Sequence, residues 1–346
     1  MDWIMWYTYF AIFVAVYVVG LFLPGKLPNF GDEVFERNNT TVYKGIAITI
    51  IILAHFMNEF GHGIRWFTPL GGIGVAVFLL LSGYGLNESW SKSEMMQWGD
   101  TDKPYDKWWR KRIVSVFIPY VIVQIILYWP FHAFNITAFL LDLTCIKPLY
   151  HNGWYLNYLL IMYIMFYCVQ RFVSNKNIRF IIYLSISIII LIYASEMYAE
   201  QAFSFTTGVT ISSYKDRIHK KFKIRNIIFL LILGVGFLTL KQLPVIRQAP
   251  QVMMNGVQLF IKLPLGLSFI LLAFYCGRWI HFRVSYRVGL ISYELYLIHG
   301  YCLKMWNQSI MDAILFILVS VLLSIAFWKG YEIVRKKLYI SLKLRK

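Results

Sequence analysis

Charged residues are scarce in this chain of 346 residues: Asp, Glu, Lys and Arg together make up 15% of it, and only 17 residues are acidic. Hydrophobic residues make up 59% and aromatic residues 18%, a composition that excludes a water-soluble globular protein. Long polar segments are missing as well, so no soluble domain is expected between the apolar runs. The sequence therefore predicts an integral membrane protein whose chemistry is done by the helical bundle itself.

Cysteine is also scarce. The four cysteines show neither CxxC spacing nor the spacing of metal ligands: Cys145, Cys168, Cys276 and Cys302. Scattered cysteines near the ends of apolar runs are typical of small buried residues. We expect neither a disulfide framework nor a metal site.

Apolar runs of roughly 17 to 24 residues are abundant, and each is about long enough to cross the ~30 Å hydrocarbon core of a bilayer as a helix. They predict an all-α, polytopic membrane helix bundle. Eleven spans are expected, near residues 2–24, 45–60, 71–87, 113–130, 153–170, 180–197, 199–213, 226–241, 257–276, 289–306 and 310–329. The weakest is 199–213, because Glu200 and several hydroxyl side chains need polar neighbours in lipid.

The net charge of +17 comes from Lys and Arg in alternate loops. With the spans placed as above, 28 of the 34 basic residues fall on one side of the membrane, the pattern of loops kept in the cytoplasm. We therefore expect a multi-pass protein of the cell (inner) membrane, with its N-terminus outside and its basic C-terminus against lipid headgroups in the cytoplasm. This distribution argues against a nucleic-acid partner, and the oligomeric state stays unknown.

The stretch KGIAITIIILAHF places one lysine and one histidine at the two ends of an apolar run. Lys44 and His55 are eleven residues apart, about three helical turns plus about 20°, so both lie on one helix face roughly 16 Å apart along the axis. An imidazole at that depth in a membrane indicates a functional site, although an interhelical hydrogen bond by a neutral ring is the structural alternative. Asn58 and Glu59 follow near the same face, where Glu59 could orient or charge the ring.

Five stretches resemble, in order, the motifs of the membrane-bound acyltransferase-3 family, whose members move acyl groups from acyl-CoA onto sugars and related acceptors. The first is KGIAITIIILAHF itself. The others are GGIGVAVFLLLSGYGL, WWRKRIVSVFIPY, NGWYLNYLL and ISYELYLIHGY, at residues 71–86, 108–120, 152–160 and 291–301. One position departs from the family pattern, because Ser115 stands where a second arginine usually follows Arg112.

The resemblance implies an integral-membrane O-acyltransferase that uses acyl-CoA, expected to be acetyl-CoA, and a cell-surface or lipid-linked glycan as acceptor. It divides the chain into an added N-terminal transmembrane helix and cytoplasmic loop (1–43), a bundle of about ten core spans (44–330) and a basic cytoplasmic tail (331–346). Lys44, Arg110 and Arg112 would hold the phosphates of coenzyme A. His55 would act as general base or as acyl carrier.

Three further residues are candidates for binding the acceptor substrate. Ser82 lies in the glycine-rich span, where close helix packing is the simpler explanation. His151 and Trp154 lie where the outer face meets the fifth span, and they are candidates for a sugar platform. A belt of interfacial aromatic residues explains Trp154 equally well.

Tyr293, Glu294 and His299 are also candidate substrate-binding residues. Glu294 lies several residues inside a predicted span and needs a polar partner. A site role and an internal buried pair with His299 both remain open.

A secondary transporter or exporter of a glycan or small molecule is the alternative function, with the intramembrane His and Glu relaying protons or binding cargo. Two features argue against it: the chain has no repeated half, and its basic residues converge where a phosphorylated donor would dock.

Overall fold

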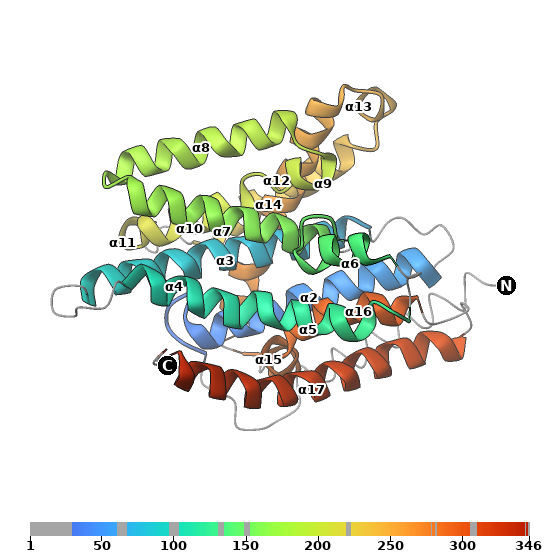
Figure 1. The fold of residues 1–346 in the computed structure, drawn as a ribbon. Coiled ribbons are helices and arrows are strands. Elements are labelled where there is room, and N and C mark those ends of the chain that lie inside the picture. The colour runs from blue at the N-terminus through green and yellow to red at the C-terminus, as the bar shows by residue number, and fades with distance from the viewer. Residues whose placement is uncertain are drawn as a thin grey trace. The chain divides into compact units, whose positions relative to one another are not determined.

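The computed structural model describes residues 30–60, 68–96, 104–130, 135–148, 153–218, 223–277, 279–280, 282–304, 310–342 and 344. Every regular element within these ranges is a helix (Figure 1), which confirms the all-α prediction. The predicted span at 2–24 and the candidate residue His151 lie outside the described residues.

The chain forms two compact units. The first unit comprises residues 1–87 and 162–290, and the second comprises 88–161 and 291–346. Helices α3 (Thr68–Met96) and α7 (Trp154–Phe172) each contribute to both. The other long helices of the first unit are α2 (Arg37–Phe60), α8 (Lys176–Tyr193), α10 (Ser204–Ser213), α12 (Ile224–Leu240), α14 (Gln251–Cys276) and α15 (Arg283–Leu290). Its short helices are α9 (Glu196–Ala199), α11 (Lys215–Ile218) and α13 (Pro244–Arg247).

Five of the described helices are long and apolar enough to cross a membrane: Arg37–Glu59, Pro69–Lys92, Lys176–Tyr193, Gln251–Cys276 and Ile314–Ser341. Helix α12 is a shorter apolar helix. The chain is therefore a membrane protein with several apolar helices, and the count of about ten core spans stays a prediction.

The weakest predicted span, 199–213, is interrupted in the structure. Helix α9 ends at Ala199 and α10 begins at Ser204. The ten residues of α10 rise only about 15 Å, roughly half of a hydrocarbon core. Its polar side chains have the partners that the sequence required, since Thr206 hydrogen bonds to Ser187 of α8 and Ser212 accepts from Asn87 of α3.

Glycines set the closest helix contacts in the first unit. A Cβ on Gly83 of α3 would overlap the carbonyl of Phe205 in α10, and a Cβ on Gly208 of α10 would overlap the carbonyl of Leu80 in α3. The two backbones therefore meet through reciprocal glycines, as small residues allow in membrane bundles. The packing explanation offered for the glycine-rich span accounts for Gly83. Helices α2 and α15 meet in the same way, through Gly45 and Gly289.

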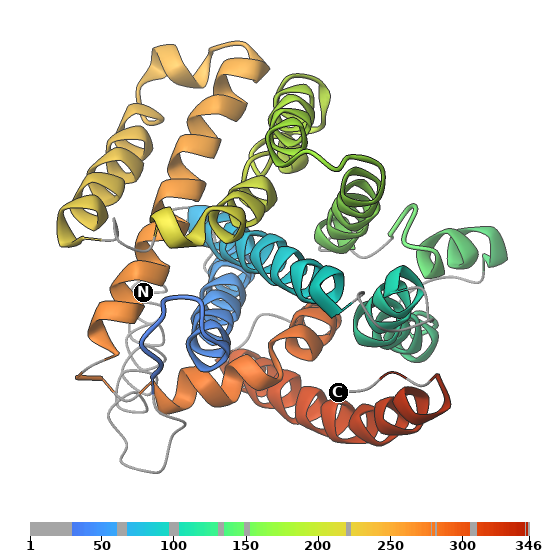
Figure 2. The same cartoon turned by 90° about the vertical axis from the view of Figure 1, so that its left-hand side faces the viewer.

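Helices α12 and α14 lie side by side and are joined through α13 (Figure 2). Gly234 of α12 leaves room for the side chain of Leu265 on α14. A buried apolar cluster on α14 continues to α3 and contains Ile73, Val257, Ile261 and Leu265. This packing fixes α14 against the beginning of α3, where the glycine-rich span starts.

In the second unit, three helical segments follow one another without a break, and the middle one is a π-helix with a widened turn. Helix α4 (Pro104–Arg112) passes into a π-helix, η2 (Ile113–Phe117), and then into α5 (Ile118–Leu127). The unit also contains α6 (Ile136–Leu143), α16 (Ser292–Leu303) and α17 (Ile310–Ser341). Helix α17 runs on without a break through residues 331–341, so the segment predicted as a basic tail is helical up to Ser341.

Candidate functional site

Helix α2 carries Lys44 and His55. It runs without a break from Arg37 to Phe60, so the eleven-residue spacing puts both residues on one face, roughly 16 Å apart along the axis. Both side chains are half-buried. Asn58 and Glu59 lie near the C-terminal end of the helix and are exposed. The helical geometry assumed from the sequence is present, and the roles of these four residues stay predictions.

The Lys44 end of α2 is held firmly. The buried Asn39 side chain accepts from the Gly31 N–H and donates to the carbonyls of Gly31 and Glu33, at 3.0, 3.0 and 2.8 Å. The buried Tyr43 hydroxyl donates to the Val34 carbonyl at 2.9 Å. These bonds tie the chain before α2 onto its first turns, so the backbone at Lys44 is fixed.

Helix α15 adds basic residues next to this end of α2. Because Gly289 packs on the Thr41 carbonyl and Gly45 packs on the Ser285 carbonyl, α15 crosses α2 beside Lys44. It carries a half-buried Arg283 and an exposed Arg287. The crossing brings a second helix with basic residues to the Lys44 end of α2, which the sequence alone did not reveal because residues 61–282 separate the two helices in the chain.

A buried ion pair lies beside the beginning of the glycine-rich helix α3. Lys262 of α14 pairs with Glu200, and their side chains are only 7% and 10% exposed. The lysine stem passes over Gly72 of α3, where any Cβ would collide with it. Gln201 donates to the Gly72 carbonyl at 2.8 Å. Sequence reasoning missed Lys262, although Glu200 and Lys262 are the only charged residues in the predicted spans 199–213 and 257–276.

This ion pair and His55 lie near the same stretch of α3. A Cβ on Gly71 would stand 3.3 Å from the Cβ of Ala54, the residue before His55, while the next glycine, Gly72, contacts Lys262. Gly71 thus packs on α2, and the adjacent Gly72 packs on α14. Ser82, the other candidate on α3, is half-buried about ten residues further along.

The second unit holds the candidate donor residues Arg110 and Arg112 on α4. Arg112 donates to the Ser89 hydroxyl at 3.2 Å, and its guanidinium stands 5.6 Å from the ring centre of the buried Trp108. Arg110 is exposed. Ser115, which departs from the family pattern, hydrogen bonds to Tyr339 of α17 at 3.2 Å.

Helix α16 carries the last three candidates. The Tyr293 hydroxyl donates to the Val116 carbonyl of η2 at 2.6 Å. Glu294 is buried, with 8% of its surface exposed. His299 is fully buried, and its Nδ1 lies 2.9 Å from the Leu295 carbonyl of its own helix.

Aromatic contacts join α16 to the start of α7. The ring of Tyr296 meets the ring of Tyr155 edge-on, with centres 4.9 Å apart, and lies 5.8 Å from the ring of His299. Trp154, the neighbour of Tyr155, is half-buried at the first residue of α7. The second unit therefore brings Trp154 close to α16, where the structure places Tyr293, Glu294 and His299.

Comparison with known families assigns the chain. The model of a family described as an acyltransferase domain matches residues 40–329, which is most of the sequence. The chain belongs to the acyltransferase-3 family. Neither curated proteins nor solved structures gave a match. The match confirms the resemblance found in the sequence and identifies a membrane acyltransferase, which favours the enzyme over a transporter.

The contacts of the basic residues in this acyltransferase separate structural roles from candidate donor binding. Among the basic residues, Lys176 donates to the Ser213 carbonyl at the end of α10, and Arg179 donates to the Gln170 and Val173 carbonyls at the end of α7. These two side chains satisfy helix C-termini. They are therefore poorer candidates for donor binding than the exposed Arg110.

The cysteines of the acyltransferase are free thiols, two of them buried. Cys145, in the loop after α6, has a positive φ of 58°, and burial raises the pKa of its thiol to about 12. Such a thiol is not ionised near neutral pH, so it is a poor nucleophile. Cys145 and Cys302 fit the prediction of buried small residues, whereas the prediction is wrong for Cys168, which is exposed, and Cys276 is half-buried.

Proposed function

We propose that the protein transfers an acyl group, expected to be acetyl, from cytoplasmic acyl-CoA to a hydroxyl of a cell-surface or lipid-linked glycan. The observation that carries the proposal is the uninterrupted helix α2 with a half-buried imidazole about three turns from a half-buried lysine, inside the region that matches the acyltransferase family. Coenzyme A has phosphates at one end and a thioester at the other, so a cation and a base on one helix face suit its two ends.

The donor phosphates are proposed to bind basic residues at the cytoplasmic face. In the first unit, Lys44 has Arg283 and Arg287 on the neighbouring α15. In the second unit, Arg110 and Arg112 offer guanidinium groups, which form forked hydrogen bonds to phosphate. Each of the two groups is proposed from its own unit alone.

His55 is proposed to handle the proton of the acceptor. As a general base, the imidazole takes the hydroxyl proton while the hydroxyl oxygen bonds to the thioester carbon; the C–S bond then breaks and the proton passes to the coenzyme A thiolate. As an acyl carrier, the imidazole nitrogen first forms a C–N bond as the C–S bond breaks. The acceptor hydroxyl oxygen then bonds to the acyl carbon as the C–N bond breaks, and the hydroxyl proton passes through the imidazole to the coenzyme A thiolate. Glu59, four residues on, is proposed to orient the ring, and Asn58, Trp154 and Glu294 are proposed contacts of the acceptor.

The test is the variant His55→Ala, measured as transfer of a labelled acyl group from acyl-CoA to membrane glycans. We expect loss of transfer while the protein still inserts and keeps its thermal midpoint in detergent. His62→Ala, seven residues further along, is the matched control and should keep transfer. Full transfer by His55→Ala would refute the proposal.

A second measurement separates the two roles of His55. Wild-type protein is mixed with labelled acyl-CoA without acceptor, and protein-bound label is measured after rapid quenching. If the wild-type protein carries label and His55→Ala does not, His55 is an acyl carrier. If the wild-type protein carries no label but still transfers the acyl group to the acceptor, His55 is a general base.

A further inference from the structure

The π-helix η2 directly follows the basic end of α4, and its backbone is short of hydrogen-bond donors. The Ile118 N–H bonds to the Ile113 carbonyl, five residues back. The Val114 carbonyl therefore loses its α-helical donor, Ile118, and its π-helical donor would be residue 119, which is a proline without an N–H. Val114 is 1% exposed, so water does not replace the missing donor.

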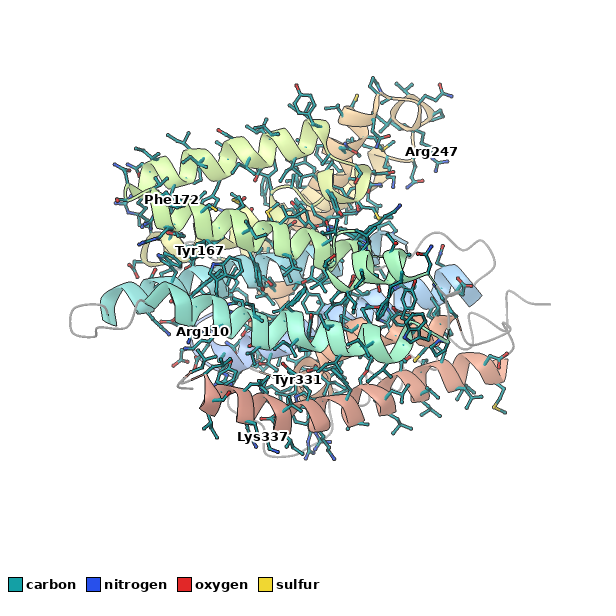
Figure 3. All side chains as sticks on the ribbon, viewed as in Figure 1. Arg110, Tyr167, Phe172, Arg247, Tyr331 and Lys337 are labelled. Carbon is teal, nitrogen blue, oxygen red and sulfur yellow. The ribbon has the colours of Figure 1, made fainter. Side chains whose placement is uncertain are left out.

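A tyrosine from α17 supplies that donor. The hydroxyl of Tyr331, which is 5% exposed, donates to the Val114 carbonyl. The Tyr293 hydroxyl of α16 donates to the Val116 carbonyl at 2.6 Å. Two phenols from two other helices of the second unit thus hold two carbonyls of the same widened turn. Figure 3 shows Tyr331 on the side of α17 that faces α4 and α5, with Arg110 on α4.

The widened turn decides where the residues before it point. Each residue rotates a helix by about 100°, so a turn that holds one extra residue rotates the preceding helix by about that angle relative to α5. Arg110 and Arg112 lie within the last turn of α4. If η2 relaxed into an α-helix, their side chains would leave the directions that they have now.

We propose that Tyr331 and Tyr293 are positioning residues for donor binding, because their hydroxyls hold η2 in its π-helical form and thereby aim Arg110 and Arg112 at the phosphates of acyl-CoA. This inference rests on the proposed function. It assigns to Tyr293 a role at the backbone in place of contact with the acceptor. It also gives a role to Tyr331, which lies outside the region 40–329 that matches the family.

The experiment measures acyl-CoA turnover and acyl-CoA binding for the double variant Tyr293→Phe/Tyr331→Phe in purified protein. Because one buried hydrogen bond is worth about fivefold in an equilibrium, we expect the KM for acyl-CoA to rise by about tenfold or more. The kcat and the KM for the acceptor should stay within about twofold of wild type. Tyr339→Phe is the matched control, since it removes a hydroxyl of the same helix whose described hydrogen bond goes to the Ser115 side chain and not to a backbone carbonyl. It should change none of the three constants.

The outcomes separate this inference from the function on which it rests. Wild-type protein that neither binds acyl-CoA nor transfers an acyl group overturns the proposed function. An active wild type with a double variant that matches Tyr339→Phe overturns the role of the two tyrosines. A double variant that loses kcat, acceptor affinity and thermal stability together has only lost its fold, and that result also overturns the positioning role.

Discussion

The two units satisfy buried polar groups by different means. The first unit encloses a full charge of each sign, Lys262 and Glu200, among apolar helices. In the second unit, phenols donate to the backbone carbonyls of Val114, Val116 and Asp142. A charge that loses its partner inside a protein is far more costly than a carbonyl that loses one hydrogen bond. The comparison teaches that the first unit adds one buried ion pair to its neutral hydrogen bonds, whereas phenols hold the carbonyls of Val114 and Val116 in the second.

The largest expected effect comes from breaking the ion pair on one side. Lys262→Met leaves Glu200 buried without its cation, and we expect the free energy of unfolding to fall by about 3 to 5 kcal/mol. Thermal and denaturant unfolding in detergent measure this loss. The double variant Lys262→Met/Glu200→Leu should recover most of the stability, because it removes both charges. A single variant as stable as wild type would mean that the pair is not buried from solvent.

The second-largest effect on stability is expected where the backbones of α3 and α10 meet in the first unit. Gly83→Ala forces a Cβ into the Phe205 carbonyl of α10, and overpacking of this kind costs about 1 to 3 kcal/mol. Gly85→Ala is the matched control on the same helix, since a Cβ there meets nothing within 4 Å. It should be neutral or slightly stabilising. Equal unfolding midpoints for the two variants would contradict the contact between α3 and α10.

The smallest effect tests the neutral bonds of the second unit. The buried Tyr120 hydroxyl donates to the Asp142 carbonyl at 2.7 Å and lies 3.4 Å from an oxygen of the Asp142 carboxylate, so Tyr120→Phe should cost about 1 to 2 kcal/mol of unfolding free energy. Unfolding in detergent measures it beside Lys262→Met. If Tyr120→Phe proved as damaging as the broken ion pair, the distinction between the two units would fail.

Much of the architecture was predictable from the sequence, because a long apolar run specifies a helix by itself. Helices α2, α8, α14 and α17 correspond to predicted spans, and the need of Glu200 for a polar neighbour was recognised. The identity of that neighbour was not. A single lysine hardly changes the hydropathy of an apolar run, so Lys262 would have been found only by looking for opposite charges in separate spans.

The candidate site was predictable where it depends on one helix and not where it depends on several. The spacing of Lys44 and His55 is a property of α2 alone, and the structure keeps it. The π-helix η2 was not predicted, since it depends on Pro119 together with phenols that arrive from α16 and α17. Likewise, α15 packs on the Lys44 end of α2 through glycine contacts that no local pattern encodes.

The length of α17 matters for anyone who handles this protein in the laboratory. If the chain were truncated at the domain boundary near residue 329 to attach a fusion partner or affinity tag, Tyr331 would be lost and the Val114 carbonyl would lose its hydrogen-bond donor. Expression plasmids should therefore keep the reading frame intact through Ser341, with any added sequence placed beyond it.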